Sequence, residues 1–264
     1  MNNFIFLSKN GQDEYVNMFA RGCGAMPVST EAFDFDASNE PIVLRGILNK
    51  VIKQCQRSQR DFWYIDSGYF GNTPSRSNPN GWKHWHRIVP NNLQHSKIIE
   101  RPADRWEQLQ INLEPRKYGS KIIIAAPDEK PCKFYKIEQQ QWIEQTVATI
   151  KRYTDRQIIV RQRAPKREDR VLLDPLSAVL ADDVHALVTY NSVAAVESVI
   201  AGVPVFTLAP TNAADPVASR GLANIDNPTW PDSLLREAWV HHLAYGQFHI
   251  NEMRRGQAHK ILFG

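Results

Sequence analysis

The sequence has few cysteines and lacks the common nucleotide-binding and metal-binding signatures. Its three cysteines, at positions 23, 55 and 132, are scattered and have no metal-ligand spacing. An odd, unclustered set excludes a disulfide framework and favours a reducing compartment, the cytoplasm. The patterns GxGxxG and GxxxxGK[ST] are also absent, which excludes the usual dinucleotide-binding turn and the P-loop.

Long apolar runs are missing as well. No stretch approaches the ~18 to 20 apolar residues of a membrane-spanning helix. The opening run MNNFIFLSKNGQDEY is too short in apolar residues for a signal peptide and turns polar at once. We therefore expect no membrane span. The net charge of +4 permits a polyanionic partner without requiring one. The sequence indicates no oligomeric state.

Strand-like and helix-like segments alternate along the chain, which predicts an α/β fold with mainly parallel sheets. Two such blocks predict two Rossmann-like lobes, followed by C-terminal helices that pack back across the first lobe. We place the acceptor-side lobe at 1–104, the nucleotide-sugar-binding lobe at 105–238 and the crossing helices at 239–264. Apolar residues at helical spacing predict one amphipathic helix over 40–60. Segment 73–94, rich in Pro, Asn, Gly and Ser, is expected to be a long functional loop.

Suggestive side chains follow the predicted strands of the second half. Parallel α/β sheets bind ligands beyond the carboxyl ends of their strands. Arg161, Arg163 and Lys166 come at or just past one strand end, and Asn191-Ser192 ends the next. Arginine suits forked phosphate contacts, with lysine as a point charge beside it. These basic residues also fit a solvated rim.

The run from Asn191 to Glu197 predicts a strand end followed by a short helix. Ser192 is expected to cap this helix, and the free N–H groups of the first turn to receive a diphosphate. Helical side chains lean toward the N-terminus, so Glu197 would face the same ligand and accept both hydroxyls of a ribose. Each residue also has a structural alternative: Ser192 as a cap without ligand, and Glu197 as a surface acid favoured by the helix dipole.

The run VTYNSVAAVESVIAGVPVF, 188–206, resembles the nucleotide-sugar-binding half of GT-B glycosyltransferases, especially capsule-polysaccharide-type transferases. TDRQIIVRQR, GLANIDNP, HHLAYGQFHINEM and RRGQAHKIL resemble a group of glycosyltransferase-like proteins common in bacteriophage genomes. The likeness covers about 60–264. It implies a GT-B-like fold and a nucleoside diphosphate sugar, a UDP-sugar, as donor rather than a prosthetic group. It also implies that Arg161, Lys166 and Ser192 hold phosphates and that Glu197 holds ribose.

Such an enzyme needs a general base on the acceptor side, usually a carboxylate or histidine. Asp66, which ends the predicted strand FWYID, is the first candidate, and Asp13 is the second. Both also suit a structural role, Asp66 in a turn and Asp13 at a helix N-terminus. No DxD motif suits a metal, and Asp182-Asp183 fits a surface turn, so we expect a metal-independent reaction. We also expect inversion, the outcome for which such a general base is needed.

Segment 75–87, SRSNPNGWKHWHR, interleaves basic, aromatic and amide residues, as single-strand and flipped-base binding sites do. Trp82, His84, Trp85 and His86 are the candidate acceptor-binding residues. With the phage resemblance, this segment favours DNA as the acceptor, at the hydroxyl of hydroxymethylated pyrimidines such as hydroxymethylcytosine. A capsule or surface polysaccharide, or its precursor, is the alternative acceptor. A noncatalytic nucleotide-sugar-binding or structural phage protein is a third hypothesis.

Overall fold

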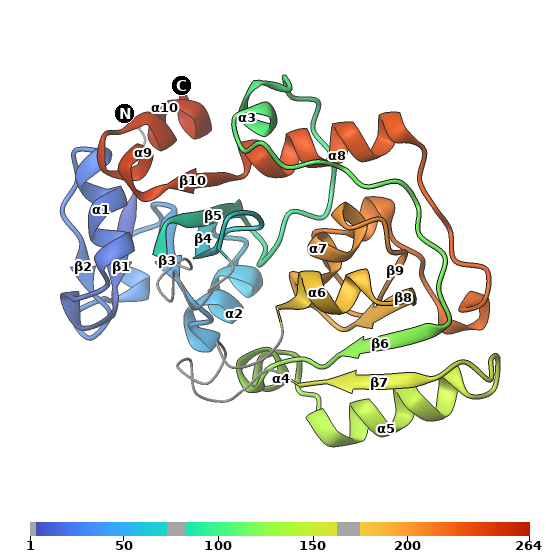
Figure 1. Cartoon of the computed structure of the whole chain (residues 1–264). Helices are drawn as coiled ribbons and strands as arrows, with labels where there is room; N and C mark the ends of the chain where they lie inside the picture. Colours follow the sequence, from blue (N-terminus) through green and yellow to red (C-terminus); the bar gives the residue numbers. More distant parts are fainter. Residues whose placement is uncertain (1–3, 73–82, 163–174) are drawn as a thin grey trace. The chain divides into compact units, whose positions relative to one another are not determined.

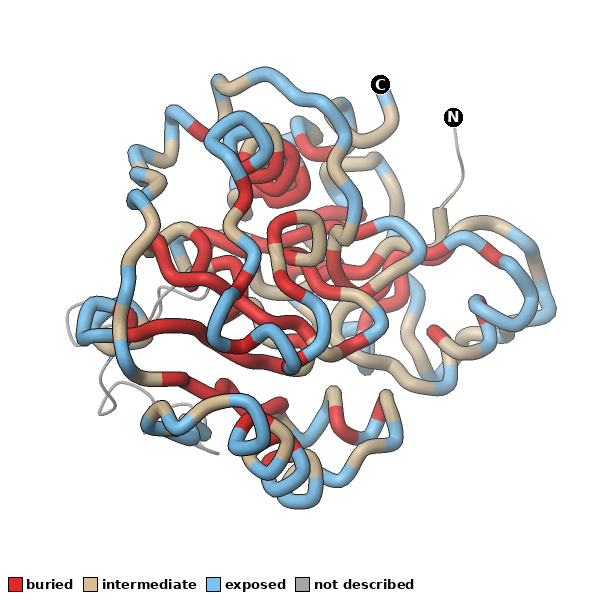
Figure 2. The backbone as a smooth tube through the Cα atoms, turned by 90° about the vertical axis from the view of Figure 1, so that its right-hand side faces the viewer, coloured by how far each residue is buried: buried red, intermediate tan, exposed pale blue. Residues whose placement is uncertain are grey.

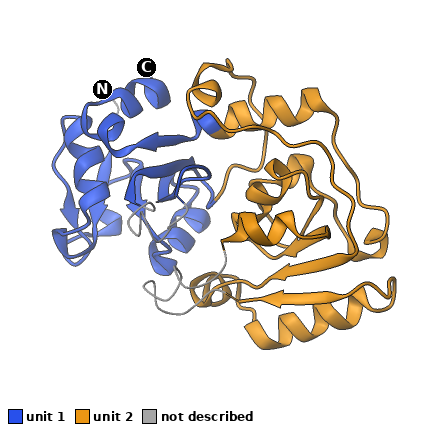
Figure 3. Ribbon diagram, viewed as in Figure 1, with its two compact units in different colours: residues 1–72, 80–93, 244–264 blue, residues 73–79, 94–243 orange. Residues whose placement is uncertain are grey.

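The computed structural model describes residues 4–72, 83–162 and 175–264 (Figure 1). The chain divides into two compact units (Figure 3). Unit 1 comprises Met1–Asn72, Asn80–Leu93 and Ala244–Gly264, and unit 2 comprises Thr73–Pro79 and Gln94–Leu243. No helix among the described residues is long and apolar enough to cross a membrane.

Unit 1 is built on a six-stranded sheet of order β10-β5-β4-β3-β1-β2. Strands β1 to β4 pair in parallel, whereas β5 runs antiparallel to both β4 and β10. The strands are β1 Ile5–Ser8, β2 Val28–Ser29, β3 Ile42–Arg45, β4 Phe62–Ser67, β5 Trp85–Pro90 and β10 Gln247–His249. The helices are α1 Glu14–Gly22, α2 Asn49–Ser58, α9 Ile250–Arg254 and α10 Gln257–Phe263, with 3₁₀ turns η1 Lys9–Gly11 and η2 Phe35–Ala37.

The C-terminal helices pack back onto the first helix of unit 1, as predicted. Met253 of α9 lies fully buried in one core cluster with Phe6 and Phe19. The backbones approach so closely that a Cβ added to Gly22 of α1 would lie 1.9 Å from the Met253 carbonyl oxygen. Only glycine allows this contact, which ties the end of the chain to its beginning.

Two segments of unit 1 differ from the prediction. Segment 40–60 is not one helix, because Ile42–Arg45 forms strand β3 before α2 begins. The apolar residues of β3 are fully buried in the middle of the sheet, and Gly46, with φ of +69°, follows this strand. The predicted loop 73–94 contains strand β5, whose polar residues His86 and Arg87 are buried. In a sequence, polar residues that are buried inside a strand cannot be told from the polar residues of a loop.

Unit 2 contains a four-stranded parallel sheet of order β7-β6-β8-β9. Every residue of β8 is buried, which is typical of a parallel strand covered on both faces; Figure 2 colours the backbone by burial. The strands are β6 Lys121–Ala125, β7 Ile158–Arg161, β8 Val184–Thr189 and β9 Val205–Thr207. The helices are α3 Asp104–Glu107, α4 Glu129–Tyr135, α5 Gln139–Ile150, α6 Leu176–Ala181, α7 Ala194–Ile200 and α8 Ser233–Tyr245, which continues into unit 1, with 3₁₀ turns η5 Asp215–Val217 and η6 Leu222–Asn224.

Gly202, in the Ala-Gly-Val-Pro run, lies just past the end of helix α7. Its φ is +83°, and a Cβ there would lie 2.1 Å from the Pro115 carbonyl oxygen. The sharp turn returns the chain directly into β9, so the β8–α7–β9 crossover is short. This crossover places Asn191 and Ser192 just beyond the carboxyl end of β8.

Candidate functional site

The carboxyl edge of the unit 2 sheet carries the predicted donor-binding residues. Thr189, the last residue of β8, hydrogen-bonds both to the neighbouring strand β6 and to the Asn191-Ser192 loop that follows β8. Its hydroxyl donates to the Ala125 carbonyl oxygen at 2.9 Å and accepts from the Ser192 N–H at 3.3 Å. The end of β6 and the Asn191-Ser192 loop are therefore held together by one buried side chain.

Two amide side chains, those of Gln94 and Asn212, donate hydrogen bonds to the backbone of the Asn191-Ser192 loop. Gln94 donates through Nε2 to the Asn191 carbonyl oxygen and accepts the Ala213 N–H at 2.9 Å. Asn212 donates through Nδ2 to the Ser192 carbonyl oxygen at 3.3 Å. Gln94 and Asn212 are buried. Sequence reasoning missed both, since nothing local indicates that residues so far apart along the chain share a loop.

Ser192 contacts the start of α7, but the expected row of free N–H groups is not there. The Ser192 hydroxyl accepts the Ala194 N–H at 3.2 Å. The Ala195 and Val196 N–H groups donate to the Ser192 and Val193 carbonyl oxygens, at 3.2 and 2.8 Å. The prediction that first-turn amides receive a diphosphate was therefore wrong for these three N–H groups. The Ser192 hydroxyl proton is the donor that this position can offer to a phosphate oxygen.

Arg161 and Glu197 lie on opposite sides of the Ala125 strand end. Arg161 ends edge strand β7, and Glu197 is in the first turn of α7, which follows β8. Strands lie about 4.8 Å apart, so the ends of β7 and β8 are separated by about 10 Å, with β6 between them. The Ala126 N–H donates to the Arg161 carbonyl oxygen at 3.1 Å. Ala125 and Ala126, which are both buried, bring only small side chains to the middle of this edge. Lys166 and Arg163 lie outside the described residues.

Three aromatic side chains gather beside this edge, a feature that sequence reasoning missed. Tyr190 meets Tyr135 edge-on at 5.3 Å between ring centroids and Trp142 at 6.1 Å. Burial raises the pKa of the Tyr135 hydroxyl, so this group stays neutral near pH 7. The cluster gives the edge an apolar wall next to polar Asn191 and Ser192, a combination typical of nucleotide sites.

The carboxyl edge of the unit 1 sheet carries the two candidate bases. Asp13 caps α1: its Oδ1 accepts the Tyr15 and Val16 N–H groups, both at 3.1 Å. Its Oδ2 lies 3.1 Å from Arg45 Nη1, at the end of β3. The Asp13 side chain is 13% exposed. The contacts of Asp13 therefore match its structural alternative, in which it is an acid that caps the N-terminus of a helix.

Asp66, at the end of β4, is more accessible, with 37% of its side chain exposed. It accepts hydrogen bonds from the Tyr64 hydroxyl at 2.6 Å, the Ser67 N–H at 2.8 Å and Arg87 Nη2 at 3.2 Å. Burial raises the pKa of the Asp66 carboxyl, but the Arg87 guanidinium and the donated hydrogen bonds outweigh burial and lower this pKa below its ordinary value. Asp66 is thus a fixed, ionised carboxylate at neutral pH.

The predicted acceptor-binding residues have different environments. His84 stacks in parallel on His249 at 5.9 Å, and Trp85 meets His249 edge-on at 5.4 Å. His86 is fully buried against Tyr15, with ring centroids 4.0 Å apart. Trp82 lies outside the described residues. Because the His86 ring has no exposed surface, direct contact with an acceptor is excluded for it, and its place in the acceptor set was wrong.

The His86 ring is held in one tautomer. Its Nε2 lies 3.2 Å from the Lys83 carbonyl oxygen, so Nε2 carries the proton, whereas Nδ1 has no hydrogen-bond partner among the described residues. Burial, reinforced by the nearby Arg45 guanidinium, lowers the pKa of His86 to about 4. A neutral, enclosed imidazole of this kind serves the packing of unit 1.

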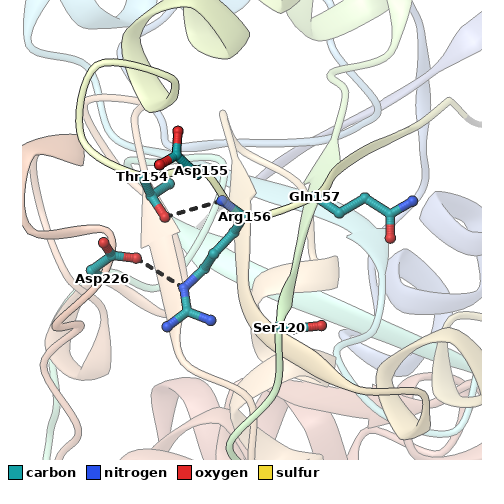
Figure 4. Close-up of a pocket in the computed structure, with 6 residues that line it drawn as sticks. All are labelled: Ser120, Thr154, Asp155, Arg156, Gln157 and Asp226. Carbon is teal, nitrogen blue, oxygen red and sulfur yellow. Dashed lines mark hydrogen bonds and ion pairs between the residues drawn. The ribbon is translucent and has the colours of Figure 1, made fainter.

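A hollow at the other edge of the unit 2 sheet is lined by Ser120, Thr154, Asp155, Arg156, Gln157 and Asp226 (Figure 4). Ser120 and Gln157 immediately precede β6 and β7, so this hollow lies at the amino edge. Arg156 is paired there with Asp226 at 2.8 Å. Ligands of parallel α/β sheets bind at the carboxyl edge, and we assign no function to this hollow. In the described part of the chain, no group of His, Cys, Asp or Glu is arranged to hold a metal ion.

No protein-family model and no curated protein matches the sequence. Among solved structures, the chain is similar to Thermosulfurimonas dismutans KpsC, beta Kdo 2,7 transferase. The TM-score is 0.55 at 10% identity, over 98% of this chain and 99% of that chain. The two chains share one fold. A second structure of this fold is the beta Kdo 2,4 transferase of KpsC from the same organism, with a TM-score of 0.52 at 10% identity over 96% and 98% of the two chains. The predicted two-lobe α/β fold is confirmed.

Proposed function

We propose that this protein is a nucleotide-sugar-dependent glycosyltransferase, with a UDP-sugar as donor and a hydroxymethylated pyrimidine of DNA as acceptor. The observation that carries the transferase proposal is the carboxyl edge of the unit 2 sheet. The proposal is supported by a fold shared with two sugar transferases, by Arg161 at the end of β7, and by Ser192 and Glu197, which follow the end of β8.

In this proposal, the donor lies across the ends of β7, β6 and β8. Arg161 and the Ser192 hydroxyl bind the two phosphates, and Lys166 contributes a further charge. The Glu197 carboxylate accepts both ribose hydroxyls, and Tyr190 borders the base. Positive charge and fixed hydrogen-bond donors at the diphosphate favour its departure, because they stabilise the negative charge that develops on the leaving oxygen.

The transfer itself is a single displacement. The acceptor hydroxyl oxygen attacks the anomeric carbon, and its proton passes to a carboxylate, for which Asp66 is our first choice. The bond between the anomeric carbon and the diphosphate oxygen breaks, and its electron pair leaves with UDP. The configuration at the anomeric carbon is inverted. Asp66 is preferred over Asp13 because it is more exposed and is not used to cap a helix.

DNA as the acceptor is supported by the net charge of +4 and by the basic, aromatic and amide residues of 75–85, since the next two residues, His86 and Arg87, are buried. A saccharide acceptor is the second candidate, supported by the fold shared with two Kdo transferases. A noncatalytic role would leave donor binding intact without any turnover.

The test is incubation with a panel of UDP-sugars and DNA that contains hydroxymethylcytosine or hydroxymethyluracil, followed by digestion and weighing of the nucleosides. A gain of one sugar mass that requires the hydroxymethyl group supports the proposal. UDP binding without any gain in mass on DNA favours the saccharide acceptor or a noncatalytic role, which turnover on oligosaccharides separates.

The matched pair Arg161→Ala and Arg152→Ala tests the donor site within the same experiment. Loss of a forked charge-assisted contact at Arg161 costs ~1.5 to 3 kcal/mol, or about 10- to 100-fold in UDP affinity. Arg152 is exposed at the end of α5, so its removal should leave UDP affinity unchanged. Equal affinities for the two folded variants would remove Arg161 from the site.

A further inference from the structure

The exposed face of helix α2 in unit 1 carries a row of positive charge. Lys50, Lys53 and Arg57 are spaced three and four residues apart, so they lie on one side of the helix. Lys50 and Arg57 are exposed and Lys53 is half-buried. Helix α2 contains no acidic residue to offset them. Like charges at this spacing repel each other and destabilise an isolated helix.

A surface hollow follows this row and is lined by Asn49, Lys50, Lys53, Gln54 and Arg57. The described residues that line it carry either a cationic or an amide side chain. Such a lining suits a ligand that carries anionic groups, because Lys and Arg side chains form charge-assisted contacts with them.

The dimensions of the row fit a strand with regularly spaced charges. From Lys50 to Arg57 the helix rises by about 10 Å, at ~1.5 Å per residue. A stacked DNA strand carries one phosphate per ~3.4 Å of helix axis, so the row is about as long as the axial rise of three nucleotides.

Helix α2 also begins near the candidate base. It starts at Asn49, shortly after Arg45 ends β3, at the same edge of the unit 1 sheet as Asp13 and Asp66. A strand bound along α2 would therefore lead toward this carboxyl edge.

We propose that the basic face of α2, defined as Lys50, Lys53 and Arg57, binds the phosphate backbone of a DNA strand that carries the acceptor base. The inference rests on the proposed function for the identity of the acceptor. It adds a backbone-binding surface that none of the predicted site residues provides. Because phosphate contacts fix position without reading sequence, binding at this face should depend on salt and on strand length rather than on base sequence.

The test compares two triple variants that each lose three positive charges. Lys50→Gln/Lys53→Gln/Arg57→Gln removes the basic face, and Gln keeps the helix propensity of Lys and Arg. Lys151→Gln/Arg152→Gln/Lys260→Gln removes exposed charges elsewhere and serves as the control. Binding of a fluorescent single-stranded 20-mer is measured by anisotropy, without donor, over a series of NaCl concentrations. Circular dichroism and thermal unfolding confirm that both variants fold.

For the α2 variant, we expect affinity at low salt to fall about tenfold or more. The slope of log K against log salt should become shallower by about 2, since each phosphate contact on a single strand contributes ~0.7. The control variant should bind nearly as the wild type does. Equal losses in both variants, or no loss in the α2 variant, would overturn the inference, and so would a wild type that binds no DNA.

Two further measurements separate this inference from the proposed function. Sugar transfer to free hydroxymethylcytidine, which has no phosphate backbone, should be unchanged in the α2 variant, while KM for long DNA should rise. DNA binding that depends on α2, with no transfer to any DNA, would support the basic face and contradict the proposed acceptor chemistry. Binding of a carboxylated polysaccharide that depends on α2 and outcompetes DNA would overturn the assignment to DNA.

Discussion

Arg45 and Asp13 form an ion pair at the carboxyl edge of the unit 1 sheet, with 3.1 Å between Nη1 and Oδ2. Arg45 ends β3, and Asp13 lies in the connection between the neighbouring strand β1 and helix α1. The Arg45 guanidinium also lies over the Tyr15 ring, 4.3 Å from its centroid. Asp13 therefore uses one oxygen to cap α1 and the other to hold Arg45 over the first turn of that helix. These contacts favour a structural role for Asp13.

This role predicts different outcomes for two substitutions of Asp13. Asn caps helices as well as Asp does, whereas Ala removes the cap at a cost of about 1 kcal/mol of unfolding free energy. Asp13→Ala should therefore lower stability in urea by about this amount, and Asp13→Asn much less. Asp13→Asn should also keep most of the sugar-transfer activity. Loss of turnover in a stable Asp13→Asn variant would instead make Asp13 the general base.

Asp66→Asn tests the preferred base. We expect UDP affinity to stay unchanged and turnover to fall by ~10² or more, because the amide cannot take the acceptor proton. Tyr64→Phe is the matched control, since it removes one hydrogen bond to Asp66 and keeps the carboxylate. That control should remain active, with an acidic limb of its pH–rate profile shifted upward, because the Tyr64 hydroxyl helps to lower the pKa of Asp66. Full activity of Asp66→Asn would transfer the base role to another group.

The β8–α7–β9 crossover of unit 2 could be predicted from sequence because each of its features is local. A fully apolar strand, a short helix that ends at Gly202 and a Pro-containing return are all visible within 186–206. The placement of Asn191 and Ser192 at a strand end followed directly. The anchors of this loop, Gln94 and Asn212, come from distant segments and leave no local pattern.

Strands β3 and β5 show where local patterns fail. The four residues of β3, Ile42–Arg45, of which the first three are buried, were included in the predicted helix because helix and strand patterns coincide over so short a run. His86 and Arg87 suggested a loop, yet Arg87 is buried because Ser67, Leu93 and Asp66 satisfy its guanidinium. Only tertiary partners make such a polar strand stable, and a single sequence does not reveal them.

The buried histidines predict an acid-sensitive fold. Burial is the main cause that lowers the pKa of both His86 and His242 to about 4, against about 6.5 in the unfolded chain. Between these values the unfolded chain binds more protons, so stability is complete above about pH 6.5 and is lost as the pH falls toward 4. Around His86, Arg45 opposes protonation, and Asp66 and Asp13 favour it.

The measurement is the free energy of urea unfolding at a series of pH values between 7 and 4.5. His86→Gln keeps a neutral side chain that can donate to the Lys83 carbonyl oxygen and should flatten part of this dependence. His242→Gln should remove a separate part. If the unfolding free energy of the folded His86→Gln variant depended on pH as steeply as that of the wild type, His86 would have to titrate in the native state much as it does in the unfolded chain.

Glu197 offers the sharpest test of donor orientation. If its carboxylate accepts both ribose hydroxyls, the wild type should bind UDP more tightly than 2′-deoxy-UDP, by the ~1.5 to 3 kcal/mol of a charge-assisted hydrogen bond. Glu197→Gln should weaken UDP binding and shrink this difference, whereas Arg161→Ala should weaken both nucleotides alike. As an acid favoured only by the α7 dipole, Glu197 would instead contribute ~0.3 to 1 kcal/mol to stability and nothing to ribose discrimination. A ratio of UDP to 2′-deoxy-UDP affinity that stays constant in Glu197→Gln, together with a small loss in stability, would therefore remove Glu197 from the donor site.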